Sequence, residues 1–333
     1  MFKKVLVATD RLKAADPAVL TAANIADQSS AKLHIIHVLE SASIKNRDIV
    51  KHYQSGDEML TTSAYEKSVK TVIMQNYARQ LKENENCEVK VVSGFPWHEI
   101  GRFSREVGSD LIVMGPHSSK AQEKGVVRVA GKLGSTVEGV IMHERCPVMI
   151  INHDIPAERL RFQKILVGID FSESCACALW FAVSLARAFQ STLYLFYMLP
   201  VPPDPEYSQA DYTSDLDAAS QRLHAFCRDA VAGADHEYSI WGGALPHVEI
   251  LNSAEKHHAD LIVMGSHTKE KQGKWYTGNA VERVAFRSKC PVAAITDPGA
   301  LRPFKESVTN GNIQAGTNFH DGEKRIAAEN DDG

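Results

Sequence analysis

The chain has 333 residues, of which 44% are apolar and 23% are charged, and its formal net charge at pH 7 is -4. This length favours two ordinary domains over one, and the slightly negative charge provides no global basic field that would hold a nucleic-acid backbone. No stretch approaches the roughly 20 apolar residues of a membrane-spanning helix, and Asp10 interrupts the N-terminus before a signal sequence can form. We therefore expect a cytoplasmic protein with free thiols that binds neither nucleic acid nor membrane.

The first part of the chain alternates between apolar runs typical of buried strands and segments with helical spacing. Residues 4–9 suit a strand that is buried on both faces of a parallel sheet. Asp16 followed by Pro17 predicts a helix start, because the carboxylate accepts from free N–H groups and proline fits the first helical position. Further strands are predicted at residues 33–39, 88–92, 111–114 and 149–151, and helices at residues 60–81 and 98–107.

The same pattern then restarts. KILVGID at residues 164–170 repeats KVLVATD at residues 4–10, and DLIVMG occurs at residues 110–115 and again at 260–265. The segment that begins at Gly134 and ends in Cys146-Pro147-Val148 likewise matches the segment from Gly278 to Cys290-Pro291-Val292. The chain is therefore a tandem repeat.

The repeat predicts the domain organisation and the fold class. We expect a first domain at residues 1–153, a linker at 154–162, a second domain at 163–297 and a polar, disordered tail at 298–333. Strands that alternate with helices imply right-handed crossovers and parallel strands. The predicted fold is α/β, with two tandem doubly wound domains that each contain a five-stranded parallel sheet.

Several polar or small residues follow the predicted strands directly. In an open parallel sheet the ligand crevice lies beyond the carboxyl ends of the strands, where Asp10, Gly115, Asp170 and Gly265 are expected. Two aspartates at matching positions make a purely structural role for each less attractive. The alternative is that each aspartate simply terminates a buried strand and that duplication produced the pair.

Two later segments show the spacing of a capping box, in which a polar cap is followed three residues later by glutamate. Ser135 with Glu138 has the standard form, and Asn279 with Glu282 is a variant of it. A helix that starts in this way points free N–H groups at the preceding loop, where a triphosphate could bind. A glycine before each cap would let a phosphate approach the backbone, although capping alone also explains the caps.

With these residues the chain resembles the universal stress protein family in its tandem form. The nucleotide loop of that family has a glycine, two residues, a second glycine, nine residues, and then a glycine followed by Ser, Thr or Asn. The second half fits this pattern with Gly265, Gly278 and Asn279, but Thr268 stands at the middle glycine. His267 lies inside the same loop and is included among the candidate ligand contacts.

The first half departs further from the family pattern. Ser118 stands at the middle glycine, and fifteen residues rather than nine separate it from Gly134. The resemblance implies that Asp170 contacts the adenosine end of a nucleotide and that the Met198 backbone frames the adenine. The corresponding candidates in the first half are less favoured; they are Asp10, Val38, Gly115, Gly134 and Ser135.

The resemblance implies a stress-response protein that binds ATP, or another adenine nucleotide, as a regulatory ligand, mainly through the second domain. No Walker lysine, GxSxG elbow or nucleophile–base pair is found in the sequence, so at most a slow, incidental ATPase activity is expected. No HExxH or paired CxxC spacing occurs either, so no metal site is expected. The family's dimers suggest that the last strands of the two halves pair in an intramolecular pseudo-dimer, which leaves a homodimer open as well. The alternative is a nucleotide-free scaffold of the same fold that binds a partner or a small ligand.

Overall fold

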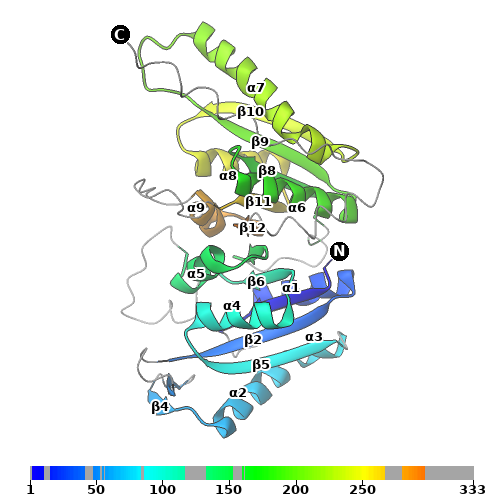
Figure 1. Cartoon of the computed structure of the whole chain (residues 1–333), viewed down its shortest axis with the longest axis vertical. Helices are drawn as coiled ribbons and strands as arrows, with labels where there is room; N and C mark the ends of the chain where they lie inside the picture. The colour runs from blue at the N-terminus through cyan, green and yellow to red at the C-terminus, as the bar shows by residue number, and fades with distance from the viewer. Residues whose placement is uncertain are drawn as a thin grey trace, which may run out of the picture.

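A computed structural model of the chain describes residues 2–10, 16–41, 48–52, 55, 57–83, 86–116, 133–152, 160, 162–266 and 280–296. Its described strands form a ten-stranded sheet in the order β10-β9-β8-β11-β12-β7-β6-β1-β2-β5 and a separate two-stranded sheet, β3-β4. Each half of the chain supplies five consecutive strands of the large sheet (Figure 1).

The first half of the chain builds one end of the large sheet. Its strands in that sheet are β1 (Lys4–Ala8), β2 (Lys32–Glu40), β5 (Cys87–Gly94), β6 (Leu111–Met114) and β7 (Val148–Ile150). The small hairpin consists of β3 (Ile49–Lys51) and β4 (Glu58–Leu60). The helices are α1 (Pro17–Ser29), α2 (Ser63–Asn76), α3 (Ala78–Glu83), α4 (Pro96–Val107) and α5 (Ser135–His143).

The second half repeats this order without a described counterpart of the hairpin. Its strands are β8 (Lys164–Ile169), β9 (Thr192–Pro200), β10 (His236–Gly243), β11 (Leu261–Gly265) and β12 (Val292–Ile295). Its helices are α6 (Glu173–Phe189), α7 (Gln209–Val231), α8 (Pro246–His257) and α9 (Ala280–Arg287). Within each half, all strand pairings of the large sheet are parallel, which confirms the predicted doubly wound fold with five parallel strands per half.

The two halves meet at one antiparallel strand pair. Strand β7 pairs with β12 in a register that sets Met149 opposite Ala293. These two residues occupy equivalent positions of the repeat, since each follows a Cys-Pro-Val sequence. The predicted pairing of the last strands is therefore confirmed, and it joins ten strands into one continuous sheet.

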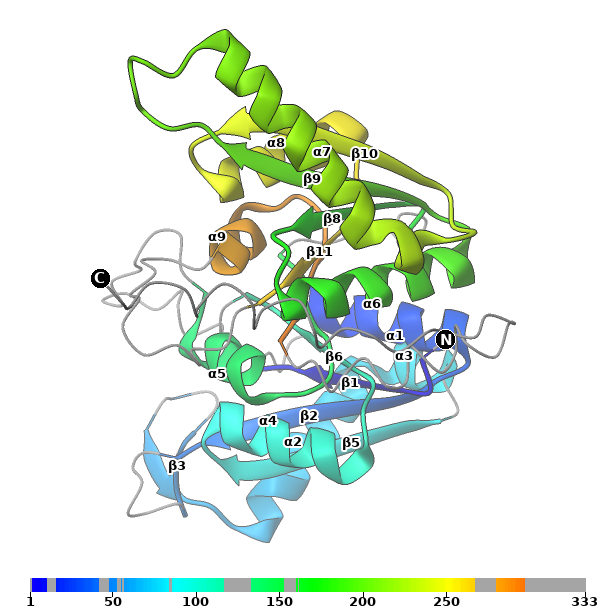
Figure 2. The ribbon, with the colours of Figure 1, turned by 45° about the horizontal axis from the view of Figure 1, so that its top comes forward.

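Helices cover both faces of this sheet (Figures 1 and 2). One apolar core contains residues of α1, α2, α6 and α7, and the other contains residues of α4, α5, α8 and α9. Neighbouring residues of β1 divide between the two cores, with Val5 and Val7 in one and Leu6 in the other. This alternation follows from the two-residue period of a strand and explains the continuous apolar runs in the sequence.

Local details confirm some predictions and correct others. Helix α1 begins as expected, because the Asp16 Oδ1 accepts a hydrogen bond from the Ala18 N–H at 3.0 Å. The single helix predicted at residues 60–81 is wrong: Leu60 ends strand β4, and the helical part divides into α2 and α3 at Tyr77. The Thr62 hydroxyl, which accepts from the Tyr65 N–H at 3.1 Å, caps the start of α2.

The predicted linker and tail lie mostly outside the described residues. Within residues 154–162, the described Leu160 and Phe162 are buried in the first apolar core. The predicted tail at 298–333 lies entirely outside the described residues. Within the part of the chain that the structure covers, no helix is both long and apolar enough to cross a membrane.

Candidate functional site

In the second half, the predicted site residues Asp170, Met198 and Gly265 lie at one edge of the sheet. Strand register sets Gly168 opposite Met264 and Ile169 opposite Tyr197. Asp170 and Met198 each come one residue later, and Gly265 ends strand β11. The structure thus brings these three residues to the shared carboxyl edge, as the sequence predicted.

Asp170 takes part in the turn that starts helix α6. Its Oδ1 accepts hydrogen bonds from the Ser172 N–H at 3.0 Å and from the Ser172 hydroxyl at 2.6 Å. The same hydroxyl oxygen accepts from the Cys175 N–H at 3.1 Å and so caps the helix. The exposed Asp170 side chain therefore has a structural role at the point where the family resemblance places the adenosine.

Gly265 allows helix α6 to pack directly on the end of β11. A Cβ added at Gly265 would lie 2.6 Å from the carbonyl carbon of Ser174 and 2.8 Å from the Cα of Cys175. Both neighbours are backbone atoms of the first helical turn, so they cannot turn away as a flexible side chain would. This close approach brings the N-terminal end of α6 to the candidate edge.

An aromatic cluster next to Asp170 was missed in the sequence. Phe171 has a φ of 63°, and its ring lies 4.7 Å from the Tyr197 ring and 5.4 Å from the Phe226 ring. The Arg222 guanidinium lies 4.0 Å above the same ring. Phe171 follows the strand-end aspartate directly, which is the one sequence signal that could have pointed to it. The cluster bounds the candidate edge on the side of helix α7.

The remaining second-half candidates are His267, Thr268, Gly278 and Asn279, and they lie outside the described residues. Helix α9 follows them directly in the sequence and begins at Ala280. The buried side chains of this helix attach it to the second core; they are Val281, Val284 and Ala285.

The carboxyl edge of the first half differs from its counterpart. Asp10 is exposed, whereas the neighbouring Thr9, Asp16 and His37 are buried. The Thr9 hydroxyl donates to Asp16 Oδ2 at 2.5 Å, and the His37 Nδ1 lies 2.8 Å from the Thr9 carbonyl oxygen. This polar cluster was not predicted from the sequence, because its members come together only when β1, β2 and α1 pack.

The start of helix α5 corrects the predicted capping box. Gly134 is the N-cap and Ser135 is the first helical residue, without a side-chain capping bond. The Gly134 N–H donates to the Pro116 carbonyl oxygen at 3.0 Å. This bond places Gly134 and Ser135 next to the end of β6, where Gly115 lies, so the structure does bring these candidates together. Val38 is in β2, close to the same edge.

The family is established by comparison with known proteins. A model of the universal stress protein family matches residues 1–152 and 161–296, which together make up most of the chain. The chain belongs to the universal stress protein family. The resemblance seen in the sequence is therefore confirmed, and the family model matches the chain twice, as a tandem repeat requires.

Curated relatives in this family are about half as long as the chain. Two universal stress proteins of Methanocaldococcus jannaschii are 27% and 28% identical; each match covers 45% of this chain and 91% or 95% of the relative. A solved universal stress protein of Archaeoglobus fulgidus covers 88% of this chain and 98% of its own, with a TM-score of 0.61 and 22% identity. A solved putative universal stress protein of Pseudomonas aeruginosa covers 92% of this chain and 98% of its own, with a TM-score of 0.58 and 16% identity. These two structures share the fold over nearly the whole chain.

The thiol at the candidate edge of this family member is not suited to nucleophilic chemistry. Cys175 is buried, and burial raises the pKa of its thiol above the ordinary value, so the thiol stays protonated at neutral pH. All six cysteines are free, as expected from the sequence. Among the described residues, no three or more His, Cys, Asp or Glu side chains are grouped so that they could hold a metal ion.

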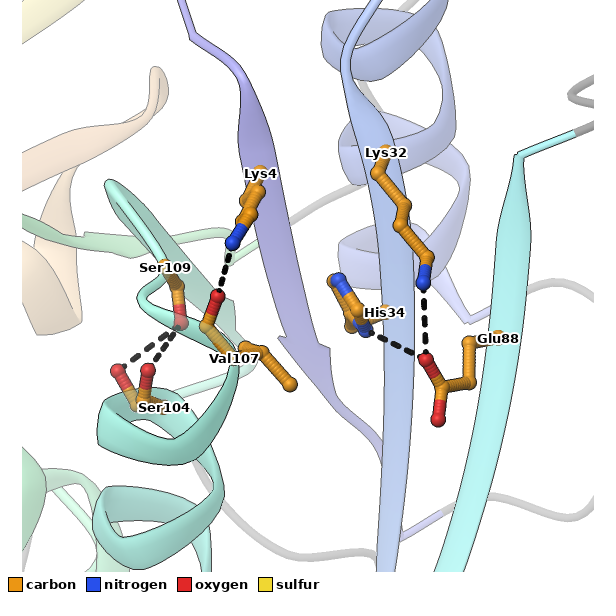
Figure 3. A network of polar contacts seen from close by, with 7 residues as sticks. All are labelled: Lys4, Lys32, His34, Glu88, Ser104, Val107 and Ser109. Carbon is orange, nitrogen blue, oxygen red and sulfur yellow. Dashed lines mark hydrogen bonds and ion pairs between the residues drawn. The ribbon is translucent and has the colours of Figure 1, made fainter.

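A polar network lies at the opposite end of the strands (Figure 3). Lys32 contacts Glu88 at 3.1 Å, and the buried His34 Nδ1 lies 3.4 Å from the same carboxylate oxygen. Burial is the main reason that the pKa of His34 is lowered, with a further contribution from Lys32. The nearby Lys4 Nζ donates to the Val107 carbonyl oxygen at 2.6 Å. Because Lys4 and Lys32 begin their strands, this network is remote from the carboxyl edge and has a structural role.

Proposed function

We propose that this universal stress protein binds an adenine nucleotide, with ATP as the favoured ligand, at the carboxyl edge of its second half. The observation that carries the proposal is the convergence of Asp170, Met198 and Gly265 at one edge of the sheet. Parallel α/β sheets bind ligands at this edge.

The surrounding helices fit a phosphate-bearing ligand. Helix α6 starts directly beside Gly265, and α9 starts one residue after the Gly278-Asn279 pair. Helix N-termini carry partial positive charge and free N–H groups, which favour phosphate. Lys269, Lys271 and Lys274 lie between these elements in the sequence and add positive charge. Asp170 and the Met198 backbone would hold the adenosine, and His267 and Thr268 would contact the ligand from the loop.

The second half is favoured over the first for two reasons. The first-half loop is longer than the family pattern, and the buried cluster of Thr9, Asp16 and His37 already occupies part of its carboxyl edge. In the second half, Ile169, Ser172 and Tyr197 stand at the comparable places near the edge. The candidates Asp10, Val38, Gly115, Gly134 and Ser135 therefore form a second, weaker site in this proposal.

The nucleotide would act as a regulatory ligand and not as a substrate. Burial raises the pKa of the thiol of Cys175, which lies beside Gly265, so this thiol stays protonated and is not an activated nucleophile. Any hydrolysis would then be slow and incidental. The protein would bind this nucleotide in the cytoplasm. Its domains would have the boundaries expected from the sequence, and its two halves would act as an intramolecular pseudo-dimer.

A second function has specific support. Gly265 is explained by the packing of α6, and Asp170 by its turn with Ser172, so neither residue requires a nucleotide. These contacts favour a nucleotide-free scaffold that uses the same fold to bind a partner or a small ligand.

The two functions are separated by mass spectrometry of the native protein and of the small molecules that it releases, followed by calorimetric titration with ATP. The test variant is Gly278→Val, which adds bulk where a phosphate would approach. The matched control is Gly134→Val, the same change at the equivalent position of the first half. The proposal is supported if the tighter ATP binding is lost in Gly278→Val and kept in Gly134→Val, which can affect only the weaker first-half site. No ATP in the purified protein and no heat on titration would favour the scaffold.

A further inference from the structure

Asn152 of the first half reaches a helix of the second half. It follows strand β7 and Ile151, whose N–H donates to the Met114 carbonyl oxygen at 2.9 Å. Its Nδ2 donates to the carbonyl oxygens of Ala285 and Ser288, the latter at 3.2 Å. These carbonyls belong to the last turn of α9 and to the residue just beyond it. Since the last carbonyls of a helix lack intrahelical partners, the amide satisfies groups that the helix cannot satisfy itself.

A side chain of the second half makes the corresponding contact with a helix of the first half. The buried Thr296 Oγ1 of the second half donates to the Ile141 carbonyl oxygen of α5 at 2.7 Å. The repeat that matches Gly134 with Gly278 also matches Ile141 with Ala285 and Asn152 with Thr296. Each half therefore binds the C-terminal end of the other half's last helix, once through an amide and once through a hydroxyl.

These helices also begin at the candidate nucleotide loops. Helix α9 has 8 residues, which gives it a length of about 12 Å. Such a short helix has little stability of its own, so its position depends on tertiary contacts. Three buried side chains attach its face to the core, and Asn152 holds its C-terminal end. A ligand at the N-terminal end and the amide at the other end would therefore act on the same short helix.

We infer that Asn152 is a positioning residue for the nucleotide site of the other half, which it serves by fixing helix α9 across the junction between β7 and β12. The inference rests on the proposed function. It assigns regulation of the second-half site to the first half, because a change at the end of β7 would act through Asn152 on the helix that begins directly after Gly278 and Asn279 in the sequence. By thermodynamic reciprocity, a bound nucleotide would stabilise β7 and Asn152 in return.

The test compares Asn152→Ala with Asn252→Ala. Asn252 offers a matched control because it is an exposed asparagine on α8 whose amide donates within its own helix, to Glu249 at 3.3 Å. We expect Asn152→Ala to weaken ATP binding about three- to tenfold, the usual range for one or two lost neutral hydrogen bonds. We expect Asn252→Ala to leave the affinity unchanged, and Asn152→Thr, which copies the side chain at position 296, to restore part of the loss.

Hydrogen exchange separates positioning from general stability. In the wild type, ATP should slow amide exchange in β7 of the first half as well as in α9, and in Asn152→Ala the slowing in β7 should disappear. An affinity that Asn152→Ala leaves unchanged, or that both alanine variants lower equally, would overturn the inference while the proposed function stands. No ATP binding by the wild type would overturn both.

Discussion

Gly265 provides a quantitative test of how α6 packs on the sheet. In Gly265→Ala, the new methyl carbon would lie 2.6 Å and 2.8 Å from two backbone atoms of α6. Real Cβ atoms do not approach heavy atoms this closely, so helix and strand must separate by several tenths of an ångström. Overpacking of a close-packed interior costs about 1–3 kcal/mol. We expect the free energy of unfolding to fall by about that amount.

The measurement is urea denaturation followed by circular dichroism, and Gly168→Ala on the neighbouring strand β8 is the control. A Cβ at Gly168 would meet side-chain atoms only, with Ile250 Cδ1 at 3.3 Å and Met264 Cγ at 3.5 Å, and both can adjust. This control should stay within about 1 kcal/mol of the wild type, because alanine also restricts the unfolded chain. Equal stability of the two variants would refute the argument that backbone contact makes glycine necessary at position 265.

Two further perturbations test the buried polar groups. Asp16→Ala removes the cap of α1 and the carboxylate that accepts from the Thr9 hydroxyl. In thermal or urea denaturation it should lower the free energy of unfolding by about 1–2 kcal/mol. A variant as stable as the wild type would contradict the capping role. His34→Phe tests the pH dependence of the free energy of unfolding. The pKa of His34 is lowered in the folded state, so below the ordinary pKa of 6.5 the unfolded state binds more protons than the folded state. Stability is therefore lost as the pH falls from 6.5 towards the pKa of the folded state. The variant should lose less stability than the wild type between about pH 7.5 and 5.5, whereas parallel urea-midpoint curves would show that His34 does not contribute.

The sequence was most informative where local physical rules act alone. Short continuous apolar runs are typical of strands that are buried on both faces, and their alternation with helical segments predicted the parallel sheet. Asp16 before Pro17 predicted the start of α1, since both residues act within one turn. The repeat itself revealed the two halves, which the family comparison matches separately.

The predictions that failed depended on partners distant in sequence. The helix expected at residues 60–81 divides at Tyr77, whose ring is buried in the core, although the helical spacing continues through it. Serine is a residue type that is preferred at the N-cap, but the bond from the Gly134 N–H to the Pro116 carbonyl oxygen makes the glycine the N-cap. Ser135 is therefore the first residue of the helix. In both cases tertiary packing outweighs a local preference of about 1 kcal/mol.

For the candidate site, the sequence alone determined which residues follow the strands, because the carboxyl ends of parallel strands must share an edge. Only the tertiary structure decided what those residues touch. It showed that Gly265 contacts the backbone of α6, that Phe171 lies under Arg222, and that Asn152 binds a helix of the other half. The reason is physical: spacing along the chain governs the direction of a side chain, whereas contact across a sheet or between two halves depends on the packing of the whole fold.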